Sequence, residues 1–177
     1  SGRGKNVFLL DKNSRIIFEK ETGGRVRSAA VSPDGSYVAA GGDEKIVYLF
    51  DSTGKSLWTF FASDVILDVS VSNDGTVVAG SMDQNIYFLD KSGNQRWKYT
   101  TDGGVSSVAI SADGKYISAG SGDYNLYLLD DSGKVLWSFP ARSNVNRVSL
   151  SNDGNLVLAG TTGGSAFLFD KTQYSIW

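Results

Sequence analysis

Carboxylates are the side chains of this sequence best suited to acid–base chemistry or to calcium binding. Adjacent or nearly adjacent acids occur at Asp43-Glu44, at Asp130-Asp131, and at Glu19 and Glu21. Paired carboxylates can share a proton transfer or supply the oxygen ligands of Ca²⁺. These acids, however, stand at equivalent positions of a repeated pattern or in connecting loops, and no partner motif accompanies them. We interpret them as turn acids and solvated surface, and we predict no catalytic residue and no metal site.

The composition excludes several other chemistries. The 177 residues include no Cys and no His, which removes disulfides, thiolate nucleophiles, imidazole bases and ordinary zinc sites. The 17 Lys and Arg against 19 Asp and Glu give a net charge of −2, so no basic excess is available to bind nucleic acid. No apolar run approaches the roughly 18 residues that cross a bilayer, and we expect no direct membrane insertion.

The sequence repeats itself along its whole length. The pattern Ser-x-Asp-Gly begins at Ser32, Ser72, Ser111 and Ser151, and an Ala-Gly pair follows each copy. A second landmark is an Asp that ends a short apolar run and is followed at a constant distance by a large aromatic residue. These aromatic residues are Phe18, Trp58, Trp97, Trp137 and Trp177. Both landmarks keep a period of about 40 residues, which predicts a repeat architecture.

Each repeat has the pattern of four short strands. In one copy, Asp113-Gly114 separates a first strand from a second, and Ser132-Gly133 separates a third from a fourth; such pairs favour tight turns. The third strands, such as 47–50 and 86–89, are apolar on both faces, so both faces must be covered. We therefore predict an all-β protein: a β-propeller of four-stranded antiparallel blades of about 40 residues.

The predicted blades do not close a ring. We expect one propeller segment over residues 1–177, with a half blade at 5–20 and blades at 25–61, 65–100, 104–140 and 144–177. The half blade supplies only the last two strands of a blade, so the chain is predicted to be part of a larger ring; the alternative is that several chains complete the ring together. Open ends expose apolar faces and strand edges, which predicts self-association or completion by another chain.

Two related families resemble this repeat. The segment from Asp51 to Trp58, repeated at 90–97 and 130–137, is similar to the tryptophan-docking motif of quinoprotein-like (PQQ-type) propellers. The Ser-x-Asp-Gly hairpin, followed by Ala-Gly and then by the acids Glu44, Asp83 and Asp123 in three of the copies, resembles WD repeats. Phe50-Asp51 and its equivalents replace the usual Trp-Asp pair. The resemblance implies that the repeated aromatic residues, from Phe18 to Trp177, are structural and pack on the neighbouring blade.

The resemblance also suggests a bound quinone cofactor. Quinoprotein dehydrogenases as a family hold calcium beside the quinone, stack a Trp on the ring axis, and often carry adjacent cysteines. This chain has no Cys, and its only Trp residues are those of the docking motif. We therefore predict no cofactor.

Positions at which the repeats differ are the candidates for function, because folding accounts for the shared ones. In the first strand, one column contains Ser28, Asp68, Ser107 and Arg147. We expect these and nearby loop residues to crowd one rim of the central channel, where rigid sheets present variable side chains; solvated loop tips are the alternative. Substitution of Asp68 or Arg147 is expected to weaken a partner without lowering stability. The predicted interaction rim is Arg25, Arg27, Ser28, Asp64, Asp68, Asp102, Ser107, Arg142, Asn146 and Arg147.

The predicted function is a non-catalytic scaffold for protein–protein or surface interaction. One alternative is part of an enzyme or ligand-sensing propeller whose functional residues lie in blades outside this chain. Another is carbohydrate binding. We expect a protein partner of unknown identity. The abundance of Ser, Thr, Asn and Gly favours an extracellular or cell-surface location, although the compartment stays open.

Overall fold

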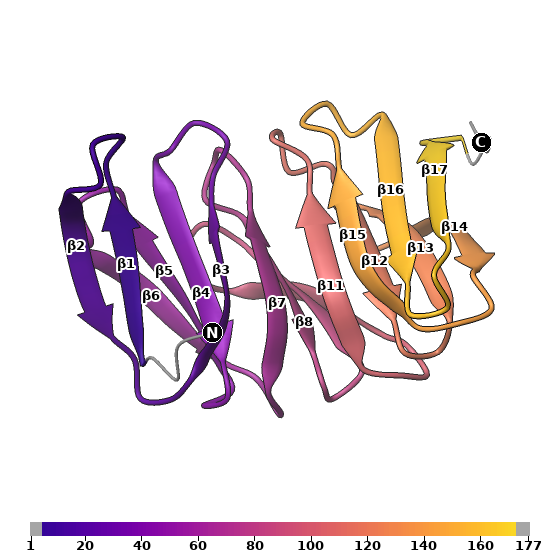
Figure 1. The fold of residues 1–177 in the computed structure, drawn as a ribbon, viewed down its shortest axis with the longest axis horizontal. Helices are drawn as coiled ribbons and strands as arrows, with labels where there is room; N and C mark the ends of the chain where they lie inside the picture. Colours follow the sequence, from indigo (N-terminus) through magenta and orange to yellow (C-terminus); the bar gives the residue numbers. More distant parts are fainter. Residues whose placement is uncertain (1–4, 173–177) are drawn as a thin grey trace.

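The computed structural model describes residues 5–172, which form antiparallel sheets and, within that range, no helix (Figure 1). The half blade contains β1 (Asn6–Leu10) and β2 (Ile16–Glu21). Blade 1 contains β3 (Val26–Val31), β4 (Tyr37–Gly42), β5 (Ile46–Asp51) and β6 (Ser56–Phe61). Blade 2 contains β7 (Ile66–Val71), β8 (Val77–Ser81), β9 (Asn85–Leu89) and β10 (Gln95–Thr100). Blade 3 contains β11 (Val105–Ile110), β12 (Tyr116–Ser121), β13 (Asn125–Asp130) and β14 (Val135–Pro140). Blade 4 contains β15 (Val145–Leu150), β16 (Leu156–Thr161) and β17 (Ala166–Asp170).

Each blade is a meander in which consecutive strands pair. Figure 1 shows the sheets side by side, from the indigo half blade at one end to the orange and yellow strands of blade 4 at the other. The predicted architecture, a partial β-propeller of four-stranded antiparallel blades, is confirmed. The predicted fourth strand of blade 4 and Trp177 lie outside the described residues. No helix in the described range is long and apolar enough to cross a membrane.

The two recurrent turns explain why the pattern folds into hairpins. In the first, Asp34 Oδ1 accepts hydrogen bonds from Ser32 Oγ at 2.6 Å and from the Ser36 amide at 3.0 Å. In the second, Asp51 Oδ1 accepts from the Thr53 and Lys55 amides at 2.9 and 3.1 Å. Both turns also need a positive φ, which Gly35 supplies at 77° in the first and Gly54 at 86° in the second. Asp and Gly at these places therefore specify the turns.

Blades stack through glycines on their second strands. Each of these glycines faces the branched residue that begins the inner strand of the next blade. A Cβ at Gly41, Gly80 or Gly120 would lie 2.5, 2.8 or 2.7 Å from Ile66 Cγ2, Val105 Cγ1 or Val145 Cγ1. The core consequently forms between blades: one cluster joins Leu49 of blade 1 to Ile66 of blade 2. The second and third strands are the most buried in blades 1 to 3. Every residue of β9 is buried, as the two apolar faces of this third strand predict.

The repeated aromatic residues dock each outer strand onto the next blade. Trp58, Trp97 and Trp137 donate from Nε1 to the backbone oxygens of Lys91, Asp131 and Lys171 at 3.1, 2.9 and 3.0 Å. The Trp58 and Trp97 rings lie against Gly93 and Gly133, and Phe18 lies against Gly54 in the same way. A side chain on any of these glycines would displace the ring.

Candidate functional site

A hollow of about 520 Å³ lies where the inner strands of the four blades begin. It is lined by Arg25, Val26, Arg27, Leu67, Ser106, Asn146 and Arg147. Four of the predicted rim residues therefore meet around one space: Arg25, Arg27, Asn146 and Arg147. All four are exposed.

The hollow is cationic, because three of its seven lining residues are arginines. Arg27 forms an ion pair with Asp43. Within the described residues, neither Arg25 nor Arg147 forms an ion pair. The two free guanidinium groups can each donate a bidentate pair of hydrogen bonds to a planar acceptor such as a carboxylate.

Three other predicted rim residues lie beneath this surface instead. Asp68 is 9% exposed and Ser107 is 1% exposed. Ser28 Oγ donates to Asp68 Oδ1 at 2.6 Å, and Ser107 Oγ donates to Asp68 Oδ2 at 2.8 Å. Asp68 also accepts from its neighbour across the blade interface, the Val108 amide, at 3.0 Å. One carboxylate thus joins three inner strands, and we now expect substitution of Asp68 to lower the stability, contrary to the expectation from the sequence.

The remaining rim residues are spread over the loops that enter the inner strands. Asp64 forms an ion pair with Lys45 at 3.2 Å, and Asp102 is exposed. Arg142 lines a different hollow, at the junction of blades 3 and 4. The rim is therefore one central cationic hollow surrounded by separate polar loops. The described residues contain no group of three side chains suited to hold a metal ion.

A buried pairing of tyrosine with acid was missed in the sequence. Tyr48 donates to Glu44 Oε1 at 2.6 Å, Tyr87 to Asp83 Oδ2 at 2.6 Å, and Tyr127 to Asp123 Oδ2 at 2.7 Å. Burial, followed by the hydrogen bond to the acid, raises the pKa of Tyr48 to about 12 and also raises the pKa of Tyr87 and Tyr127. The constant spacing of acid and tyrosine in the three repeats was the available signal.

We expect these tyrosines to make stability fall at high pH. Tyr48 ionises near its ordinary value of 10.0 when unfolded and near 12 when folded. The unfolded state therefore loses its proton first, and the free energy of unfolding falls as pH rises from about 10 toward 12. Urea denaturation across this range should show a shallower fall for Tyr48→Phe than for the natural chain. Tyr124→Phe, at an exposed position, controls for the removal of one phenol; a slope that is the same in all three proteins would contradict the prediction.

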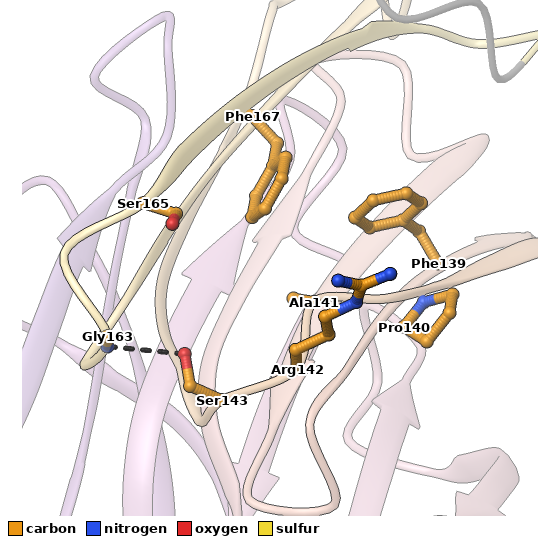
Figure 2. A pocket seen from close by; sticks show the side chains of 8 residues that line it. All are labelled: Phe139, Pro140, Ala141, Arg142, Ser143, Gly163, Ser165 and Phe167. Atoms are coloured by element: carbon orange, nitrogen blue, oxygen red, sulfur yellow. Dashed lines mark hydrogen bonds between the residues drawn. The ribbon is translucent and has the colours of Figure 1, made fainter.

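The hollow beside Arg142 measures about 530 Å³ and lies between the end of β14 and the turn from β16 to β17. Figure 2 shows the Phe139 and Phe167 rings on one side and the Ser143–Gly163 contact on the other, with the Arg142 side chain extending along the Phe139 side. The Gly163 amide donates to Ser143 Oγ at 3.2 Å. The sequence prediction placed Arg142 on the rim but did not identify this hollow.

Comparison with protein families finds two matches. Residues 43–173 match the model of a PQQ-type repeat family described as outer membrane protein assembly factor BamB. Residues 13–51 match the WD domain, G-beta repeat. A search of curated proteins found no match. The two matches confirm both resemblances that the docking and hairpin motifs indicated, and the first spans well over half of the chain.

Proposed function

The chain belongs to the PQQ-type repeat family described as outer membrane protein assembly factor BamB, and from this premise we propose that it is a propeller scaffold that binds a protein partner at the cationic hollow. Repeats of the BamB and WD types suggest a scaffold for protein interaction. In this proposal the sheets place the variable residues at fixed positions, where a partner can contact them, and no catalytic step is assigned to these residues.

The observation that supports the proposal most is the meeting of Arg25, Asn146 and Arg147 around one space. Arg25 immediately precedes β3, Asn146 and Arg147 lie in β15, and all three occupy positions that vary among the repeats. Because the inner strands pack on one another, the backbone that carries these side chains is fixed before a partner arrives, so binding has only the side chains to order. Unpaired arginines favour a partner that brings a complementary acidic group.

Photo-crosslinking in cells that produce the full chain tests this proposal. A photoreactive amino acid in place of Asn146, which lines the hollow, should give a discrete adduct with one partner. The same amino acid in place of Asn152, an exposed residue of the hairpin from β15 to β16 that does not line it, should not. Adding Arg147→Glu should reduce the adduct about tenfold.

The stability of the Arg147→Glu chain is the matched control. Arg147 is exposed and unpaired within the described residues, so its substitution should change the free energy of unfolding by less than about 0.5 kcal/mol. Equal adducts from both positions, or an adduct that survives Arg147→Glu, would contradict a partner site at this hollow.

A further inference from the structure

Blades 1 to 3 share an arrangement in which a carboxylate fills the junction with the preceding blade. The acid after the second strand accepts a hydrogen bond from the tyrosine of the third strand, as Asp123 does from Tyr127. In blades 1 and 3 it also faces the loop that leaves the preceding blade. The Asp102 amide donates to Asp123 Oδ2 at 3.1 Å, and a Cβ at Gly23 would lie 2.2 Å from Glu44 Oε2. The junction is thus built to hold one carboxylate.

Blade 4 lacks both members of the pair. Gly163 stands where blade 3 has Asp123, and Phe167 stands where it has Tyr127. The strand register confirms the equivalence, because Gly160 pairs with Ala166 as Gly120 pairs with Leu126. The turns also agree: Gly164 has a φ of 81° and Tyr124 a φ of 73°. The hollow of about 530 Å³ shown in Figure 2 lies at this junction. Blade 4 therefore has no acid of its own in this space, and Ser143 Oγ lies 2.7 Å from the position that a Cβ at Gly163 would take.

The preceding loop changes at the same junction. Arg142 occupies the position held by Asp102 in the loop before blade 3, so a cation now lines the space that has lost its acid. Among the described residues, Arg142 forms no ion pair, and its backbone amide has no hydrogen-bond acceptor. One guanidinium group and one amide are therefore available to an incoming carboxylate, at a junction where blades 1 to 3 supply a carboxylate of their own.

We propose that the hollow between blades 3 and 4 binds a carboxylate that carries an apolar or aromatic stem. The guanidinium group and the backbone amide of Arg142 hold the carboxylate, and the amide takes the role that the Asp102 amide has toward Asp123. Phe139 and Phe167, whose ring centres lie 5.0 Å apart, form the wall against which the stem packs. This site is separate from the cationic hollow, and it does not depend on the function proposed there. The carboxylate can belong to a free small molecule or to a polypeptide.

Titration of the full chain with phenylacetate, followed by NMR, tests the site. Phenylacetate should bind in the millimolar range, and its neutral analogue phenylacetamide should bind about tenfold more weakly. Arg142→Gln should weaken phenylacetate about tenfold, whereas Arg142→Lys should restore part of the affinity. Arg96→Gln, in an exposed strand of another blade, is the matched control and should bind phenylacetate like the natural chain. Equal binding of acid and amide, or no loss with Arg142→Gln, would overturn the proposal.

A variant that refills the junction gives an independent test. Gly163→Asp combined with Ser143→Gly reproduces the pair of residues found at the junction of blades 2 and 3, Asp123 and Gly103. Removal of Ser143 Oγ is needed because a Cβ at Gly163 would lie 2.7 Å from it. This variant should melt at or above the temperature of the natural chain and should no longer bind phenylacetate. Binding that persists in the refilled chain would show that the ligand lies elsewhere.

A last comparison distinguishes the two sources of the carboxylate. The probes are phenylacetate and the blocked peptide acetyl-Gly-Asp-Phe-Gly-amide, whose only carboxylate is a side chain. A peptide that binds at least about tenfold more tightly than phenylacetate assigns the site to a polypeptide, because the backbone then adds contacts. A peptide that binds more weakly assigns it to a free carboxylate. If neither probe binds, the proposal is wrong.

Discussion

Gly120→Val should lower the free energy of unfolding by about 3 kcal/mol, whereas Gly160→Val should change it by less than about 0.5 kcal/mol. The two glycines occupy the same position in consecutive blades. A Cβ at Gly120 would lie 2.7 Å from both Val145 Cγ1 and the Val145 backbone oxygen. That backbone cannot move without separating blades 3 and 4. At Gly160 no atom lies within 4 Å of the added Cβ, so the same substitution meets open space.

Urea denaturation followed by tryptophan fluorescence measures the contrast. Both substitutions place the same side chain at equivalent points of a second strand, so differences in strand propensity and in the unfolded chain cancel to first order. Gly80→Val should behave like Gly120→Val, because its Cβ would lie 2.8 Å from Val105 Cγ1. Similar losses at Gly120 and Gly160 would contradict the view that the next blade makes the glycine necessary.

The contrast also defines what the last described blade lacks. Gly41, Gly80 and Gly120 each receive the branched residue that begins the following inner strand, and Gly160 receives none within the described residues. Leu158, on the same strand, is 43% exposed. At the other end of the array, Phe8 is 48% exposed. These faces have the composition of an interior, and the association of the isolated chain, or its completion by another, stays a prediction.

The sequence predicted the blades well because their determinants are local and repeated. Asp51 and Gly54 specify a turn through hydrogen bonds and φ within a few residues, and the period of the aromatic residues fixes the place of Trp58 on the next blade. Contacts of this kind recur at every junction. A single sequence therefore contains several copies of the same signal, which composition alone would not supply.

The hollow beside Arg142 was missed for a different reason. The absence of an acid at Gly163 becomes informative only after Glu44, Asp83 and Asp123 are known to fill the same junction. From the sequence, Gly163-Gly164 resembles any turn between strands. The missing acid matters only in the folded blade, where the junction lacks the carboxylate that the other blades place there, and a pattern of residue types does not show this.

Asp68 shows why variable positions were assigned to the surface too readily. The column that contains Ser28, Asp68 and Ser107 differs from blade to blade, and variation of that kind suggests solvent. In the structure the differences are complementary: a serine on each neighbouring inner strand donates to the one carboxylate between them. The partners lie 40 and 39 residues away in sequence, so no local pattern reveals the match.

Asp68→Ala should therefore lower the free energy of unfolding by about 3 kcal/mol. The substitution leaves the hydroxyl groups of Ser28 and Ser107 and the Val108 amide without their acceptor in a buried place, and buried donors without a partner are costly. Asp68→Asn keeps one acceptor oxygen and should cost less. Asp64→Ala, at a half-buried acid of the same rim, is the control and should leave the urea midpoint almost unchanged.

A double-mutant cycle separates this explanation from a simple loss of packing. If the cost comes from buried donors without an acceptor, Ser28→Ala and Ser107→Ala should each lower the free energy of unfolding less in the Asp68→Ala chain than in the natural chain. In the Asp68→Ala chain, each serine substitution removes a donor that has already lost its acceptor. Additive losses would mean that the carboxylate does not couple the three strands. Additive losses would return Asp68 to the residues that can bind a partner. Coupled losses would leave partner binding to Arg25, Asn146 and Arg147, which line the hollow.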